Sequence, residues 1–150
     1  MNEFVEMLGW VGIYAPMALG AIASTIGCAI AGQASIGAML ETEGGYGRYI
    51  GLSAFPSTFV IYGIVIMFTL NRTVDIDNAG GLFAIGLLSG LALLYCGIWQ
   101  GRATASAINA SREKPEIFGL SLAPAAIIEG FGVFAFVFAL VISANIPGGV

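Results

Sequence analysis

The sequence contains no histidine and few charged residues. Lys, Arg, Asp and Glu together make up 9% of the 150 residues, whereas soluble domains contain about 25%. Without histidine, the chain lacks the commonest metal ligand and the side chain that most often exchanges protons near neutral pH. The net charge is −4 and only five residues are basic, which argues against the basic surface that binding to nucleic acid requires.

Cysteine is also scarce, while apolar residues are abundant. Cys28 and Cys96 both lie in apolar stretches, so the sequence predicts small buried residues there and no disulfide framework. Residues 1–6 are acidic and lack the basic region of a secretory signal peptide, so we expect the N-terminus to be retained. Apolar residues make up 58% of the chain, more than a soluble domain of this length can bury. We therefore expect a lipid bilayer around it.

Four apolar segments are long enough to cross a bilayer, which takes about 20 residues. They cover residues 10–40, 49–70, 81–109 and 119–145. The first and third are longer than a bilayer requires, because thirty helical residues reach about 45 Å. We predict an all-α membrane protein of four transmembrane helices arranged as two tandem hairpins, residues 1–70 and residues 79–150.

The basic residues predict the orientation in the membrane. Four of them flank two loops, residues 41–48 and 110–118, whereas Arg72 alone flanks the loop between them. By the positive-inside rule, the two basic loops are cytoplasmic and both termini lie outside. A prokaryotic cell membrane is the expected location. The four residues are Arg48, Arg102, Arg112 and Lys114.

The two halves of the chain resemble each other. Gly-Gln-Ala at residues 32–34 corresponds to Gly-Arg-Ala at residues 101–103. Gly-Leu-Ser occurs at residues 51–53 and again at 119–121, and a proline follows each time, at Pro56 and Pro124. An internal duplication predicts two similar hairpins that point the same way.

Small residues recur on one face of the first and third segments. This pattern lets helix backbones approach closely, while the second and fourth segments are rich in Phe, Ile and Val, which suit lipid. We predict an inner layer of small-residue helices, an outer layer of bulky ones, and a homo-oligomeric ring of identical copies. A compact four-helix monomer is the alternative. The small residues are Gly20, Ser24, Cys28 and Gly32, then Gly86, Gly90, Gly97 and Gly101.

Glu129 is the only acidic residue well inside an apolar segment. Placing a charged side chain at the bilayer centre costs about 2.5–3.5 kcal/mol even on the most lenient scale, so such residues usually have a function. Glu129 lies about 15 Å along the helix from the preceding loop. The sequence predicts an ion or proton site here, and a protonated structural glutamate is the alternative.

Other polar residues are predicted at a similar depth. Gln100 lies ten residues before the end of the third segment, and Thr58 and Tyr62 lie early in the second. Phe55, Thr58 and Tyr62 share one helix face because of their spacing. Pro56 removes a helix hydrogen bond and frees backbone carbonyls near Phe55, which can then act as ligands. Polar groups from three helices are thus expected to converge on Glu129.

These features together resemble one family. Four elements carry the resemblance: Ala-Ile-Ile-Glu-Gly at residues 126–130, Arg-Glu-Lys-Pro-Glu-Ile-Phe at 112–118, the pair Gln100-Gly101 followed by a basic residue, and Pro-Ser-Thr at 56–58 with Tyr62. The chain resembles, over nearly its whole length, the duplicated-hairpin proteolipid (the K or c subunit) of V-type and archaeal-type rotary ATPases.

The resemblance implies a rotor ring that turns against a stator membrane subunit, while other subunits hydrolyse or make ATP. The chain itself is then non-catalytic and needs no cofactor. Glu129 matches the residue that binds the ion. The resemblance implies that an arginine of the stator subunit pairs transiently with this glutamate. Gln100, Thr58 and the Phe55 carbonyl match the sodium ligands, and Tyr62 matches the tyrosine that closes the site. A central-stalk subunit is expected to contact the cytoplasmic loops.

The sequence differs from the family pattern at two positions, and two alternative functions stay open. Phe59 stands where sodium-binding members have glutamine, so we predict that protons are carried, with sodium as the alternative. Ile61 stands at the first-hairpin position that matches Glu129, so each chain carries one ion, which favours ATP-driven pumping. A small four-helix drug/proton antiporter and a pore-forming oligomer are the alternative functions.

Overall fold

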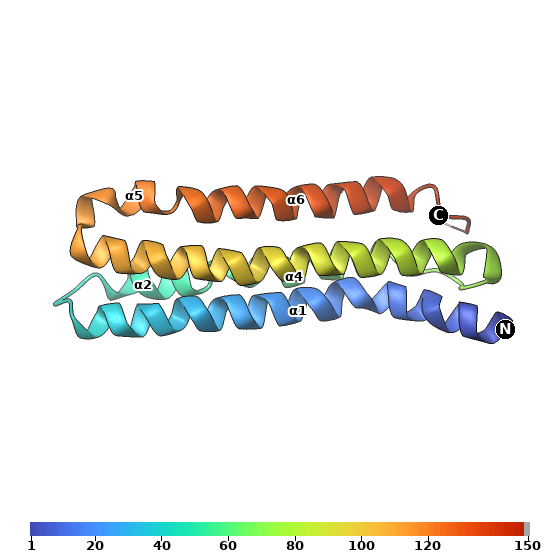
Figure 1. Cartoon of the computed structure of the whole chain (residues 1–150), viewed down its shortest axis with the longest axis horizontal. Helices are drawn as coiled ribbons and strands as arrows, with labels where there is room; N and C mark the ends of the chain where they lie inside the picture. Colours follow the sequence, from blue (N-terminus) through green and yellow to red (C-terminus); the bar gives the residue numbers. More distant parts are fainter. Residues whose placement is uncertain (149–150) are drawn as a thin grey trace.

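A computed structural model describes residues 1–148 of the chain, and every regular element among them is helical. Four stretches are long and apolar enough to cross a membrane, which confirms the predicted all-α architecture with four spans. The second and fourth stretches are each built from several consecutive helices (Figure 1). In chain order the elements are α1 (Asn2–Leu40), α2 (Tyr46–Ser53), η1 (Phe55–Ser57), α3 (Thr58–Leu70), α4 (Ile76–Glu113), η2 (Pro115–Ile117), α5 (Phe118–Ser121) and α6 (Ala123–Ser143).

The two longest helices extend beyond the predicted apolar segments. Helix α1 begins at Asn2 rather than near residue 10, and α4 runs from Ile76 to Glu113 rather than from 81 to 109. Hydropathy marks only the part of a helix that lies in lipid, whereas the ends are set by capping. The Asp75 carboxylate accepts hydrogen bonds from the backbone N–H groups of Asp77 and Asn78, which fixes the start of α4.

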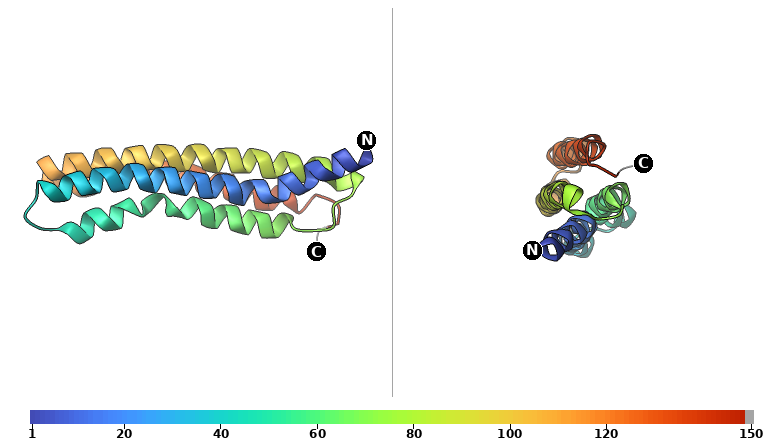
Figure 2. Two further views of the ribbon diagram at one scale, coloured as in Figure 1. Left: turned by 90° about the horizontal axis from the view of Figure 1, so that it is seen from below. Right: turned by 90° about the vertical axis from the view of Figure 1, so that its right-hand side faces the viewer.

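The two hairpins point the same way. The N-terminus, the connection between α3 and α4 and the end of α6 lie at one end of the bundle, and the other two connections lie at the opposite end (Figures 1 and 2). The second predicted hairpin, residues 79–150, corresponds to α4–α6, whose first helix begins at Ile76. Its last two residues, 149 and 150, lie outside the described part of the chain.

Helices α1 and α4 lie side by side along most of their length (Figure 2). A Cβ atom at Gly86 would collide with the backbone of Gly12, and one at Gly101 would lie 2.5 Å from the Gly27 Cα atom. The small residues of α4 therefore allow the close backbone approach that the sequence predicts.

Two of the small periodic residues of α1 pack against α3 rather than against the other small-residue helix, α4. A Cβ atom added at Gly20 would lie 2.6 Å from the Phe59 carbonyl oxygen. The Ser24 hydroxyl accepts a hydrogen bond of 3.0 Å from the Val60 backbone N–H. These two residues thus face α3, the second helix of their own hairpin. The α1 surface that faces α4 is instead formed by residues such as Gly12, Ala23 and Gly27.

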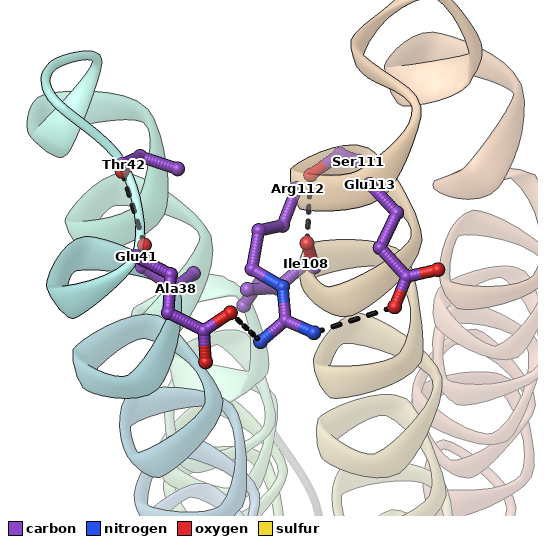
Figure 3. Close-up of polar contacts among 7 residues, drawn as sticks. All are labelled: Ala38, Glu41, Thr42, Ile108, Ser111, Arg112 and Glu113. Atoms are coloured by element: carbon purple, nitrogen blue, oxygen red, sulfur yellow. Dashed lines mark hydrogen bonds and ion pairs between the residues drawn. The ribbon is translucent and has the colours of Figure 1, made fainter.

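Polar contacts hold the two ends of the bundle. At one end, Arg112 bridges Glu41 of the first loop, at 3.0 Å, and Glu113, at 3.3 Å (Figure 3). At the other end, the Arg72 guanidinium donates to the Ile146 and Thr69 carbonyls, at 2.8 and 3.0 Å. Arg72 thereby joins the end of α3 to the segment after α6.

Candidate ion-binding site

The carboxylate of Glu129, on α6, meets side chains from two other helices. Its Oε1 accepts a hydrogen bond of 2.6 Å from the Tyr62 hydroxyl on α3. Its Oε2 accepts one of 3.0 Å from the Thr58 hydroxyl, also on α3, and one of 2.6 Å from the Gln100 amide on α4. Four of the five residues predicted from the sequence are therefore in direct contact.

Two proline-induced breaks place these groups at one level. Pro56 lies in η1, the 3₁₀ turn between α2 and α3, so α3 starts afresh at Thr58. Thr58 and Tyr62 are four residues apart and therefore project from one face of α3. Pro124 lies in the first turn of α6, where its missing N–H costs no hydrogen bond, and Glu129 follows little more than one turn later.

Gln100 is held rigidly. Its side chain is fully buried, and its Nε2 donates to the Ala125 carbonyl, at 3.3 Å, as well as to Glu129. Ala125 precedes Glu129 by one helical turn, so one amide group contacts α6 at two successive levels. The sequence gives a weak signal for this second contact, because a carbonyl one turn before the carboxylate lies on the same face of the helix.

Every group that contacts the carboxylate is a hydrogen-bond donor. Hydrogen bonds to an ionised carboxylate are roughly twice as strong as neutral ones. Three of them satisfy an ionised Glu129 without a cation, in a surrounding that is otherwise apolar. On the opposite side, the neighbours Ile127 and Phe131 on α6 are exposed, so the carboxylate lies just beneath the outer surface of the bundle.

One strong acceptor at the site has no partner among the described residues. The Oε1 atom of Gln100 is buried and makes no hydrogen bond, and the same is true of the Thr104 hydroxyl one turn away. A buried carbonyl oxygen without a donor is destabilising by about 1–3 kcal/mol. It is also a free oxygen ligand for a small cation. The oxygen therefore gives the site an acceptor to match its donors.

Neither Phe55 nor Phe59 is among the residues that donate hydrogen bonds to Glu129. Phe55 belongs to the η1 turn, and its carbonyl makes no hydrogen bond to Glu129 among the contacts described for residues 1–148. Phe59 is fully buried, and its ring fills the space left by Gly132 and Gly97. The position that is glutamine in sodium-binding members thus serves core packing here.

Aromatic contacts that the sequence analysis missed hold Tyr62 in place. Its ring stacks on Phe136 of α6, with centroids 5.0 Å apart, and meets the edge of Phe59 at 6.1 Å. Phe136 lies seven residues after Glu129, two turns along the same face of α6. That spacing is the only sequence signal for the pair, and aromatic residues are too frequent in this segment for it to stand out.

The described residues contain no group of three or more His, Cys, Asp or Glu side chains that could hold a metal ion. Any cation at Glu129 would therefore be bound by one carboxylate together with neutral oxygens. Such a ligand set suits a monovalent ion better than a transition metal, which prefers nitrogen or sulfur ligands.

Comparison with known proteins identifies the family of the chain. The profile of the ATP synthase C-subunit family matches the chain twice, over residues 11–70 and 83–142. The chain belongs to this ATP synthase family. The double match confirms the internal duplication and the resemblance to a duplicated rotary-ATPase proteolipid, and it argues against a drug/proton antiporter.

Two relatives of this ATP synthase family member are themselves components of rotary ATPases. One is the A-type ATP synthase subunit K of Methanocaldococcus jannaschii, 34% identical over 143 residues, which cover 93% of this chain and 65% of that protein. The other is the V-type sodium ATPase subunit K of Enterococcus hirae, 29% identical over 128 residues, which cover 83% and 82%. The chain thus spans just under two thirds of the length of the first relative.

Proposed function

We propose that this chain is the rotor-ring subunit of a V-type rotary ATPase and that each copy carries one proton across the membrane on Glu129. One observation carries the proposal: Glu129, the one carboxylate far from the ends of the described spans, receives three hydrogen bonds from two neighbouring helices. The family membership supports a ring of identical copies. ATP hydrolysis takes place on other subunits, and this chain is non-catalytic.

The donor shell explains how Glu129 can alternate between two states. In the ionised state the three donors satisfy the carboxylate. In the protonated state the carboxyl group needs an acceptor, and the Thr58 hydroxyl, 3.0 Å from Oε2, can accept because a hydroxyl both donates and accepts. The neutral form can then face lipid as the ring turns, because no net charge remains to be buried.

The ionised form needs a positive partner while it exchanges its proton with water. Among the described residues no basic side chain contacts Glu129. Arg102 lies over the Trp99 ring, at 4.6 Å, and Arg72 donates to carbonyls at the opposite end of α3. The partner is therefore supplied by another chain, and the resemblance to the family assigns this role to an arginine of the stator membrane subunit.

Sodium is the alternative ion. Two observations favour it: the free Gln100 oxygen, which suits a hard cation, and the similarity to a V-type sodium ATPase subunit. Against it stands Phe59, a buried hydrocarbon at the position of a family side-chain ligand. Under the sodium alternative the ligands are Glu129, Gln100, Thr58 and the Phe55 carbonyl.

The remaining features of the proposal concern the assembly. We assign residues 1–70 to a first hairpin, in which Ile61 stands at the position that matches Glu129, and residues 79–150 to a second hairpin, which contains Glu129. Each copy then carries one ion, which favours ATP-driven pumping over ATP synthesis. The loops 41–48 and 110–118 face the cytoplasm and contact a central-stalk subunit. Both termini lie outside, in a prokaryotic cell membrane.

The test uses the complete ATPase in proteoliposomes. The Glu129→Gln variant is expected to abolish ATP-driven acidification and labelling by dicyclohexylcarbodiimide, while Glu3→Gln at the exposed start of α1 leaves both unchanged. If protons are carried, pH but not sodium changes the labelling rate. Protection by millimolar sodium at constant pH would establish the sodium alternative, and normal transport by Glu129→Gln would refute the assignment of the site.

A further inference from the structure

The duplication makes the interface between the two hairpins a template for a second interface. In α1 and α4, positions 69 residues apart correspond, as Gly32 corresponds to Gly101. On α1, the residues that face α4 include Ala15, Leu19 and Ala23. A Cβ atom added at Gly90 would lie 2.7 Å from the Leu19 side chain and 3.0 Å from the Ala15 carbonyl oxygen. A Cβ atom added at Gly97 would lie 2.7 Å from the Ala23 side chain.

The counterparts of these α1 residues on α4 face an open groove in the described part of the chain. They are Ala84, Leu88 and Ala92, identical in type to Ala15, Leu19 and Ala23. They line an apolar groove of about 290 Å³ together with α6 residues such as Ala135 and Phe138. Leu88 is 65% exposed and Phe138 is 61% exposed. The surface that α1 packs against α4 is thus present a second time, on α4 itself, where it lines an open groove.

The opposite surface is also repeated. Phe83 and Gly97 of α4 lie against α1, next to Gly12 and Ala23 respectively. Their counterparts on α1 are Tyr14 and Cys28. Tyr14 is 55% exposed. The chain therefore carries both halves of its internal interface a second time, one half on each side, as a closed ring of copies requires.

We infer that the groove between α4 and α6 receives α1 of a second copy, in the register in which α1 receives α4 within one chain. The inference rests on the proposed ring and specifies its interface. Within the chain, Gly97 lies against both Ala23 and Gly27. The corresponding contacts between copies join Cys28 of one copy to Ala92 and Cys96 of the next. The two native cysteines therefore meet across the interface.

The outer helices support the same arrangement. Here positions 68 residues apart correspond, as Pro56 does to Pro124, so Glu129 corresponds to Ile61, Thr58 to Ala126 and Tyr62 to Gly130. On the inner helices, Gln100 corresponds to Ala31. Docking in this register places Ala126 and Gly130 of one copy beside Ala31 and Ile61 of the next. None of the four has a polar side chain, so at the level of Glu129 the second interface buries no unpaired polar side chain.

The side chains also set the spacing between copies. Within the chain, glycines at positions 27 and 97 bring the backbones of α1 and α4 together. Between copies, the counterparts are Cys96 and Cys28, whose side chains hold the helices farther apart.

Oxidative cross-linking of the native cysteines tests the inference. Membranes that contain the complete ATPase are treated with copper phenanthroline or with a short bis-maleimide, and the protein is separated without reductant. We expect a ladder of covalent multimers from the unaltered chain. Either Cys28→Ala or Cys96→Ala alone should abolish it, because each link joins the two different cysteines.

The register is tested by moving one cysteine. In the Cys96→Ala background, Ala92→Cys should restore the ladder through Cys28 of the next copy. Leu91→Cys should not, because Leu91 lies nine residues from Gln100 and so on the opposite face of α4, away from α6. Carbodiimide labelling of Glu129 serves as the folding control in every variant.

Three results would overturn the inference. Dimers that persist in a single-cysteine variant would show a face-to-face contact between like surfaces. A monomer of altered mobility would show a link within one chain. Absence of multimers from both the unaltered chain and the Cys96→Ala, Ala92→Cys variant would reject this interface. If Glu129 labelling and transport were normal in that last case, the proposed function would stand and only the interface would be wrong.

Discussion

The hydroxyl of Tyr62 lies 2.6 Å from Oε1 of Glu129, while the ring of the same side chain stacks on Phe136 with centroids 5.0 Å apart. One residue of α3 thus makes a polar contact with the carboxylate of α6 and an apolar contact with a ring seven residues further along the same helix. The stack fixes the ring, so the hydroxyl is held in position before any ion arrives.

The two contacts of Tyr62 can be separated. Tyr62→Phe keeps the ring and removes the hydrogen bond, which is worth about 1.5–3 kcal/mol when the acceptor is charged. We expect Glu129 to react with carbodiimide roughly tenfold faster, since 1.4 kcal/mol is a factor of ten, with little change in thermal stability. Tyr62→Leu should show the faster labelling and also a lower melting temperature. Equal labelling of Tyr62→Phe and the unaltered chain would contradict a restraining role for the hydroxyl.

Phe59 provides a test of ion choice. Phe59→Gln places an amide oxygen where sodium-binding members have one, and it leaves a gap beside Gly97 and Gly132. We expect sodium to slow carbodiimide labelling in this variant but not in the unaltered chain. Phe59→Leu, which adds no oxygen, is the control, and both variants should lose stability through imperfect filling of the site, by about 1–3 kcal/mol. Equal sodium protection in all three proteins would contradict the expectation.

The crossing of α1 and α4 predicts a contrast between two glycines of one helix. A Cβ at Gly86 would collide with the Gly12 backbone, whereas one at Gly80 meets nothing within 4 Å. Gly86→Ala is expected to be destabilising by about 1–3 kcal/mol through overpacking, and Gly80→Ala to be neutral or stabilising by up to about 1 kcal/mol. Thermal unfolding followed by circular dichroism in detergent measures both. A similar effect of the two substitutions would argue against the close approach at Gly86.

Ser35 and Thr104 occupy corresponding positions in the repeat but differ in hydrogen bonding. The buried Ser35 hydroxyl lies 2.9 Å from the Ala31 carbonyl and 2.7 Å from the Tyr49 carbonyl, so it ties α1 to α2. The buried Thr104 hydroxyl has no partner among the described residues. Ser35→Ala should therefore cost about 1 kcal/mol, whereas Thr104→Val should be neutral or stabilising.

The same thermal unfolding experiment distinguishes the pair, and carbodiimide labelling of Glu129 reports whether the site is disturbed. A loss of stability in Thr104→Val as large as that in Ser35→Ala would reveal a hydrogen bond to Thr104 that forms in the assembled ring. Such a result would require an unpartnered donor or acceptor on the neighbouring copy.

Several site features could be read from the linear sequence because each depends on few interactions. The isolation of Glu129 in an apolar run is visible without any structure, since lipid tolerates so few charges. The depths of Gln100, Thr58 and Tyr62 follow from the fixed rise of a helix. Their contacts with Glu129 required only that two hairpins pack side by side, which the duplication predicts.

Other features could not be predicted because they depend on how helices rotate against one another. The periodicity of Gly20 and Ser24 predicted a face that allows close approach, but not that this face packs against α3. The Phe136 stack and the Ala125 carbonyl contact arise from the rotation of α6 that the Pro124 break allows. Periodicity gives the face of a helix but not the identity of the helix opposite.

The sequence by itself determined the four spans, the duplication and the position of one carboxylate at membrane depth, because hydropathy, repeat and spacing are properties of a linear chain. Only the tertiary structure decided which oxygen of Glu129 each donor contacts, that Phe59 fills a core position, and which faces of α1 and α4 remain uncovered. The physical reason is that small residues permit close approach in several directions, and the rotation of each helix is settled only when all four pack together.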